Sequence, residues 1–187
     1  MTPDLETARL LLRPLQLEDA ELVQRLFPQW EIVKYLNARV PWPYPSDGVR
    51  SFYLDVCLPA IERGDEWDWT LRLKSSPHEI IGAISLVRGD KTNRGFWLAP
   101  EWQNRGLMTE AVIAANDFWF DTLGFTRLRV PKAVGNTASR RISEKTGMSL
   151  VGVEEEHEFV CGQLSAEIWE ITADEWRAFR AKKRRLS

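Results

Sequence analysis

Residues 103–111, which read Gln-Asn-Arg-Gly-Leu-Met-Thr-Glu-Ala, combine the residue types of an anion-binding turn. They follow the apolar residues 96–100 and open a long helical pattern. The first turn of a helix has unpaired N–H groups and the positive end of the macrodipole. Gly106 lets a pyrophosphate approach the backbone closely, and Arg105 adds a fixed positive charge. A glycine between a strand and a helix is also ordinary turn chemistry, so this stretch alone leaves both interpretations open.

A second polar segment further along the chain strengthens the first interpretation. Asn136-Thr137-Ala138-Ser139 precedes residues 144–148, which read Glu-Lys-Thr-Gly-Met. Together with the Gln-x-x-Gly turn, this segment resembles the acetyl-CoA site of the GNAT acyltransferase superfamily. Within the superfamily, the chain looks most like the branch containing the ribosomal-protein alanine N-acetyltransferases. The resemblance runs over residues 7–176, and its specific part is 82–148.

The resemblance implies a role for each part of the site. Ser139 would lie near the thioester sulfur and protonate the departing thiolate, and Asn136 would contact the pantetheine arm. Backbone groups at Trp97 and Leu98, on a strand splayed from its parallel neighbour, would hold the pantetheine and the thioester carbonyl. N–H groups aimed at a developing oxyanion often supply a large share of acyl-transfer catalysis. The pyrophosphate loop would consist of Gln103, Asn104, Arg105, Gly106, Leu107, Met108 and Thr109.

Two departures from the family pattern stand out. Met108 takes the place of a small residue, and we expect it to narrow the approach to the phosphates. Asn93 stands where many relatives carry a glutamate, so the usual candidate for the general base is missing. Other candidates are Glu101, the glutamates 154–156 and His157. On a regular strand, positions 154 and 156 would face one side and 155 and 157 the other. The base stays unassigned.

The missing base affects acceptor amines unequally. The pKa of an α-amino group lies about one unit above neutral pH, so its deprotonation costs roughly 1.4 kcal/mol. The pKa of a lysine lies about three and a half units above neutral pH, so its deprotonation costs about 5 kcal/mol. A site without a strong base is therefore less handicapped with an α-amine.

Aromatic residues are candidates for the acceptor wall. Trp42 and Tyr44 lie in the proline-rich stretch 41–45 and could line an acceptor pocket with Trp67 and Trp69, although the first two could equally form a lid over the core. Cys57 and Cys161 have no metal-ligand spacing and are expected to be reduced thiols. Because neither is placed as a nucleophile, direct transfer without an acyl-enzyme intermediate is expected, with acetyl-CoA as acyl donor and no metal.

The predicted strands and helices determine where these residues lie in the fold. Strands are predicted over 7–14, 67–74, 80–87, 93–98, 127–130, 150–160 and 165–171. Helices are predicted from Glu18, over 31–36, after Ser46 as N-cap with a kink or an end at Pro59, after Gly106, after Asn136 and after the capping box at Thr172. The fold class is α/β (α+β): a single mixed, mostly antiparallel sheet of about seven strands, flanked by helices and splayed at the CoA site. Residues 1–187 form one domain, with a core over about 7–176 and a basic tail over 180–187.

Composition narrows the functional classes. A net charge of -2 argues against a nucleic-acid binder. No apolar run approaches the ~20 residues of a membrane span, and the N-terminus has no secretory signal, so a cytoplasmic location is expected. The leading hypothesis is an acetyl-CoA-dependent N-acetyltransferase, monomer or homodimer, acting on a protein N-terminus or a small-molecule amine. The alternative is a non-catalytic acyl-CoA sensor. A phosphate-loop nucleotide enzyme lacks its Gly-Lys-Ser/Thr ending.

Overall fold

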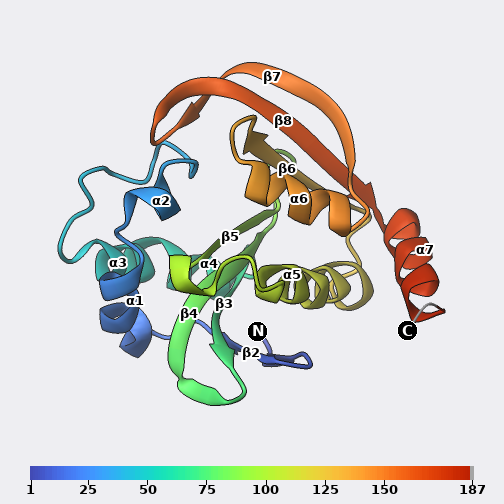
Figure 1. Ribbon diagram of the computed structural model, residues 1–187. Helices are drawn as coiled ribbons and strands as arrows, with labels where there is room; N and C mark the ends of the chain where they lie inside the picture. The colour runs from blue at the N-terminus through green and yellow to red at the C-terminus, as the bar shows by residue number, and fades with distance from the viewer. Residues whose placement is uncertain (186–187) are drawn as a thin grey trace.

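The computed structural model describes residues 1–185, whose strands form two antiparallel sheets (Figure 1). The five-stranded sheet has the order β1-β2-β3-β4-β5, and the three-stranded sheet has the order β6-β8-β7. The strands of the first sheet are Leu5–Glu6, Leu10–Pro14, Glu66–Leu73, Ser76–Val87 and Arg94–Leu98, in chain order. Those of the second are β6 (Arg127–Ala133), β7 (Ser149–Phe159) and β8 (Gly162–Thr172).

The division between the sheets falls between β5 and β6, the two strands that the sequence predicted to be splayed. They meet at one point, where the Asn93 N–H donates to the Arg129 carbonyl at 2.8 Å and the Arg129 N–H donates to Asn93 Oδ1 at 2.8 Å. Beyond this point no ladder joins the two sheets within residues 1–185. The expected single sheet is therefore split into two at the candidate site.

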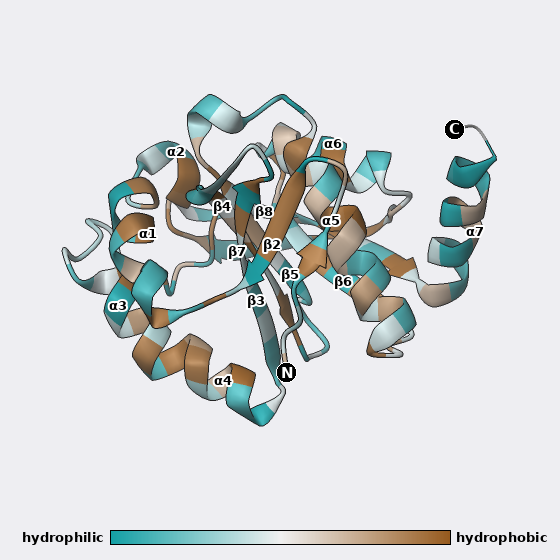
Figure 2. Ribbon diagram, turned by 90° about the horizontal axis from the view of Figure 1, so that it is seen from below, coloured by the Kyte–Doolittle hydropathy of each residue, from teal (hydrophilic) through white to brown (hydrophobic). Residues whose placement is uncertain are grey.

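Helices cover both faces of the larger sheet (Figures 1 and 2). On one face α5 (Leu107–Asp117) and the π-helical turn Phe118–Thr122 pack on the main core, which includes Trp67, Trp69 and Leu71 of β3. On the other face, helices between Ala20 and Arg63 enclose a smaller core with Ile80 of β4. The strict alternation of β3 assigns its tryptophans to the first face and its polar residues to the second.

The helices before β3 differ from the sequence prediction in two details. After a 3₁₀ turn (Leu17–Asp19) and α1 (Ala20–Leu26), α2 (Trp30–Val33) is followed by α3 (Gly48–Phe52), a π turn (Tyr53–Cys57) and α4 (Leu58–Arg63). Ser46 is not the N-cap of α3; Asp47 holds that position, without a side-chain capping bond. Pro59 does not end the helix, because it lies in the first turn of α4, directly after the π turn, where a missing N–H is tolerated.

The remaining elements lie around the gap between β5 and β6, which we call the split. The β7–β8 hairpin arches over α6 (Thr137–Lys145) and ends beside the segment after α2 (Figure 1). There the N–H groups of Val160 and Cys161 donate to the carbonyls of Leu36 and Lys34, each at 3.0 Å. The chain closes with α7 (Ala173–Arg184), and positions 186–187 of the predicted basic tail lie outside the described residues. Over residues 1–185, no helix has the length and apolar character to span a membrane.

Candidate active site

The loop between β5 and α5 has an open helix N-terminus. A 3₁₀ turn (Pro100–Trp102) leads into it, and residues 103–106 are exposed. Gly106 is the N-cap of α5 and has φ = +75°, a left-handed conformation that glycine adopts at little cost. No side chain caps this helix. The N–H groups of the first turn, at positions 107–109, therefore have no intrahelical or side-chain acceptor, which suits a phosphate.

Arg9 and Glu110 fasten this loop to the start of β2. Arg9 donates from Nη1 to the carbonyl of Arg105 at 3.1 Å and from Nε to Glu110 Oε2 at 2.7 Å. The Arg9 N–H and the Thr7 hydroxyl donate to Glu110 Oε1. Burial alone would raise the pKa of Glu110, but these hydrogen bonds and the Arg9 charge outweigh it and lower the pKa. Sequence reasoning missed this clamp, because its partners are 101 residues apart.

The other side chains of the loop between β5 and α5 differ in their contacts and exposure. Gln103 donates from Nε2 to the Leu98 carbonyl at 2.9 Å and so closes the loop onto the end of β5. The Arg105 guanidinium lies 4.8 Å from the centre of the Trp102 ring. Leu107 and Met108 are buried in the main core. The expectation that Met108 narrows the approach to the phosphates is wrong, because its side chain points inward and only its backbone belongs to the loop.

Two hydrogen bonds hold Ser139 at the start of α6. Its N–H donates to Asn136 Oδ1 at 3.1 Å, which confirms the predicted N-cap. Its hydroxyl oxygen accepts a hydrogen bond of 2.6 Å from the Lys132 ammonium on β6, and both side chains are buried. Burial lowers the pKa of Lys132 well below its ordinary value, Arg94 lowers it further, and Glu167 opposes the shift. No motif in the sequence singles out Lys132.

Two buried cations flank the ring of Phe96, across the split between β5 and β6. Lys132 Nζ lies 5.5 Å from the ring centre and the Arg94 guanidinium carbon 5.9 Å from it. Arg94 donates from Nη1 to Asn116 Oδ1 at 2.7 Å, while its Nε has no partner among the described residues. Burial lowers the pKa of Arg94 to about 9. The inner edge of the split is therefore positively charged.

Asn93 has a structural role at the position where the family resemblance led us to expect a glutamate. Its side-chain nitrogen donates to the carbonyls of Val87 at 3.2 Å and Gly89 at 2.6 Å, while its oxygen accepts from the Arg129 N–H. The amide nitrogen thus holds the connection between β4 and β5, and the amide oxygen ties it to β6. The asparagine therefore fixes the origin of the splay.

The alternative base candidates lie on solvated surfaces. A β-bulge interrupts the pairing of β7 between Glu154 and His157, and Glu156 has φ = +60°. The predicted alternation is wrong at this point, since the bulge places Glu154 Oε2 3.3 Å from His157 Nδ1. Glu154 also pairs with Arg129 at 3.3 Å. Glu101 lines an open groove of about 630 Å³ beside α1, which none of the predicted CoA-contacting side chains lines.

The four aromatic candidates for an acceptor wall do not lie together. Trp67 and Trp69 are buried in the main core beneath α5, so their assignment to a pocket is wrong. Tyr44 packs edge-on against Phe27 at 5.1 Å between ring centres. Phe27 in turn contacts Trp97 of β5 at 5.4 Å, which links the proline-rich loop to the strand at the split. Trp42 is 44% exposed and lies beside Trp30, 5.4 Å away.

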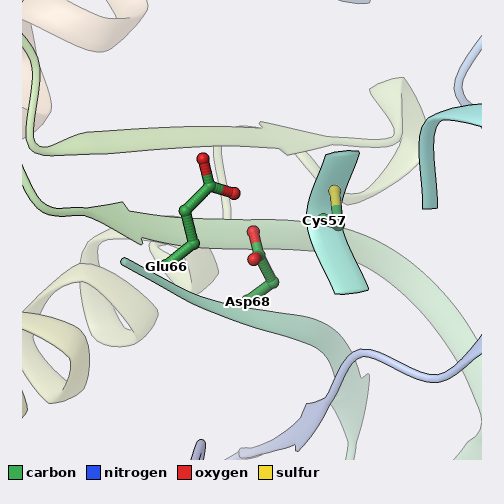
Figure 3. A group of neighbouring side chains, drawn as sticks. All are labelled: Cys57, Glu66 and Asp68. Atoms are coloured by element: carbon green, nitrogen blue, oxygen red, sulfur yellow. The ribbon is translucent and has the colours of Figure 1, made fainter. Parts of the chain in front are cut away.

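The opposite face of β3 carries a buried acidic group (Figure 3). Glu66, Asp68 and the Cys57 thiol lie within 4.8 Å of one another beneath the π turn. Burial raises the pKa of Asp68 to about 7, although a hydrogen bond with Ser85 opposes the shift, and its Oδ2 has no hydrogen-bond partner within residues 1–185. Burial also raises the pKa of Cys57, so that this thiol stays protonated at neutral pH. Spacing in the sequence gave no sign of this group.

Comparison with known proteins agrees with this geometry. The family model described as the acetyltransferase (GNAT) domain matches residues 9–149. The uncharacterized N-acetyltransferase YoaA of Bacillus subtilis is 27% identical over 157 residues, which cover 82% of this chain and 86% of that protein.

Solved structures share the fold at low sequence identity. The ribosomal-protein-S5-alanine acetyltransferase from Vibrio fischeri aligns with a TM-score of 0.78 at 18% identity, over 93% of this chain and 98% of that one. The spermidine N-acetyltransferase from Vibrio cholerae, in complex with CoA and spermine, aligns with a TM-score of 0.76 at 20% identity, over 91% and 99%. Since the family model covers most of its length, this protein belongs to the GNAT acetyltransferase family.

Proposed function

We propose that this N-acetyltransferase moves the acetyl group of acetyl-CoA directly to a primary amine, either the α-amine of a protein N-terminus or a small-molecule amine. One observation carries the proposal: the uncapped N-terminus of α5 and the fixed hydroxyl of Ser139 flank the strands at the split. Neighbours of the same fold include an acetyltransferase named for a ribosomal protein and one named for spermidine. These names support both acceptor classes.

The residues at the split fit acetyl-CoA along its length. The pyrophosphate would bind the N–H groups at the start of α5, with Gly106 leaving the backbone open and Arg105 supplying charge. The pantetheine would follow the backbone of Trp97 and Leu98 and the side-chain nitrogen of Asn136, whose oxygen is occupied by the cap. Ser139 would then donate its hydroxyl proton to the departing thiolate.

Direct transfer fits the position of both cysteines. Cys57 is buried beneath the π turn as a protonated thiol, and Cys161 is exposed in the turn of the β7–β8 hairpin. Neither lies on β5, β6 or the start of α6. The acceptor amine itself would attack the thioester carbonyl.

The charge at the split favours a weakly basic acceptor. The buried Arg94 guanidinium lies beside Phe96 together with the Lys132 amine, and like charges repel more strongly at low dielectric than in water. A polycationic amine would meet this repulsion as it entered. An α-amine, which is deprotonated at lower cost, is the preferred acceptor class in this proposal, and the cytoplasm is the location that goes with it.

The test is a screen with free thiol as the readout. Lysine-free peptides with a free N-terminus, the same peptides with a blocked N-terminus and one lysine, and polyamines are each incubated with acetyl-CoA. CoA release is expected with some free N-termini, and Ser139→Ala should lower kcat about 100-fold. A thermal shift with acetyl-CoA but no thiol release from any acceptor, in wild type or variant, would identify a sensor and refute the proposal.

A further inference from the structure

We infer that Lys132 delivers a proton through the Ser139 hydroxyl to the thiolate of the departing CoA. It is a positioning residue that acts one hydrogen bond behind the reacting sulfur. The inference rests on the role proposed above for Ser139. It adds the source of the proton, which neither the family resemblance nor the comparisons assign.

The direction of the hydrogen bond is the first step. Lys132 Nζ donates to Ser139 Oγ at 2.6 Å, so one lone pair of the hydroxyl is occupied. The serine proton must then point to another acceptor. The Asn136 cap fixes the backbone from which this hydroxyl projects. The remaining freedom of Ser139 is to donate away from Lys132, toward the split between the sheets.

The isolation of the Lys132 amine is the second step. No carboxylate lies within 4 Å of it among residues 1–185, although only 6% of the residue is exposed. Glu167, the nearest acid in electrostatic terms, is bound by the Arg140 guanidinium and by Trp169 Nε1 at 3.0 Å. A buried amine without an ion pair is costly for folding. Packing therefore does not explain a lysine here, whereas a hydrogen bond to the proposed proton donor does.

Each bond that forms in the acetyl transfer is matched by one that breaks. The acceptor nitrogen forms a bond to the thioester carbonyl carbon, and the carbon–sulfur bond breaks. Sulfur takes the Ser139 hydroxyl proton, and Ser139 takes a proton from the Lys132 ammonium. The acceptor nitrogen loses one proton to solvent, and Lys132 regains one from solvent. The products are an amide and a thiol, and the enzyme returns to its starting state.

The ionisation of Lys132 gives the inference a pH dependence. Arg94 on β5 and Glu167 on β8 face the amine, Arg140 of α6 neutralises Glu167, and burial favours the neutral form. Since the proton donor is the ammonium, kcat should fall as pH rises through the pKa of Lys132. That pKa is lowered, so the fall should begin well below the range of an ordinary lysine.

The test compares Lys132→Met, which keeps the length without the charge, with Lys132→Arg, which keeps the charge. Lys182→Met, an exposed lysine on α7, is the control. The pH at which bound CoA ionises is followed by thiolate ultraviolet absorbance, with desulfo-CoA as the blank. In Lys132→Met this ionisation should move up by about one pH unit, and kcat should fall about 100-fold with an unchanged KM for acetyl-CoA. Lys132→Arg should retain the low ionisation, because it keeps the positive charge, but its kcat should stay low, because a guanidinium does not release its proton.

Three results would overturn the inference. One is an unchanged CoA ionisation in Lys132→Met. Another is a bound CoA in Ser139→Ala that ionises at the same pH as in wild type, which would show that Lys132 does not act through the serine. The third is an alkaline fall of kcat that stays at the same pH in Lys132→Met as in wild type, which would show that Lys132 does not cause it. The absorbance titration needs no acceptor, so it decides the inference even if every amine fails and the proposed transferase reaction is rejected.

Discussion

The helices α5 and α7 each have a glutamate in their first turn, but they treat their N-terminal N–H groups in opposite ways. In α7 a capping box is complete: the Glu175 N–H donates to the Thr172 hydroxyl, and the Thr172 N–H donates to the Glu175 carboxylate at 2.8 Å. In α5 the N-cap is Gly106, which has no side chain to accept. The glutamate of α5, Glu110, turns back to Arg9 instead.

The first-turn N–H groups of α7 thus have acceptors within the protein, whereas those of α5 are open to a ligand. A carboxylate in the first turn normally competes with an external anion for the same N–H groups. In α5 the Arg9 clamp removes this competitor while fastening the loop, so the backbone donors stay open. We therefore expect changes at α5 to affect stability and CoA affinity together, and changes at α7 to affect stability alone.

Removal of the clamp should have the largest effect. Glu110→Ala leaves Arg9 without its carboxylate and deletes several charge-assisted hydrogen bonds, so the free energy of unfolding should fall by about 2–3 kcal/mol. CoA affinity should fall as well, because the loop loses its attachment to β2. Urea unfolding and calorimetric titration with CoA measure the two effects. If Glu110→Ala kept both its stability and its CoA affinity, the contact between Arg9 and Glu110 would not hold the loop in place.

The glycine at the start of α5 should give the next largest effect, and the helix segment that it begins supplies its control. Gly106 and Gly124 have φ of +75° and +74° at the two ends of this segment, so alanine should cost each about 1–2 kcal/mol of stability. Only Gly106→Ala should also weaken CoA binding, by about tenfold, because only it changes the phosphate approach. Equal CoA affinities in the two variants would show that the α5 terminus is not the phosphate site.

Thr172→Ala tests the satisfied end. Loss of the capping hydroxyl should lower the free energy of unfolding by about 1 kcal/mol. CoA affinity and the KM for acetyl-CoA should match wild type, since α7 begins after β8, outside the split. A change in either would contradict the division between the two helix ends.

The sequence predicted the local features of the site and of the fold around it. The glycine turn, the Asn136 cap and the Thr172 capping box each lie within a few residues, where backbone chemistry alone decides the structure. The splay was predicted from the family resemblance, but not the complete division of the sheet or the asparagine that pins it.

What the sequence could not supply depends on contacts between distant segments. Arg9 reaches Glu110 across 101 residues, and the Lys132 contact with Ser139 depends on how β6 packs against α6. Trp67 and Trp69 were misassigned because alternation tells which residues share a face, but not which face borders the acceptor. Met108 was misjudged for the same reason, since the family pattern gives its position but not its direction.

The smallest expected effect is the acid dependence of the two helix ends. The pKa of Glu175 is lowered by hydrogen bonds from the Thr172 backbone and hydroxyl, and that of Glu110 is lowered by Thr7 and Arg9 against the opposing effect of burial. A carboxylate whose pKa is lower in the folded state stabilises above its unfolded pKa, and this stabilisation is lost as pH falls through the folded value. Stability should therefore decline below about pH 4.5. Thr172→Ala and Glu110→Ala should each flatten this decline, the second more because Glu110 is less exposed to solvent. Unfolding midpoints measured from pH 3 to 7 test this, and a steeper decline in Glu110→Ala than in Thr172→Ala would reverse the ranking of the two helix ends.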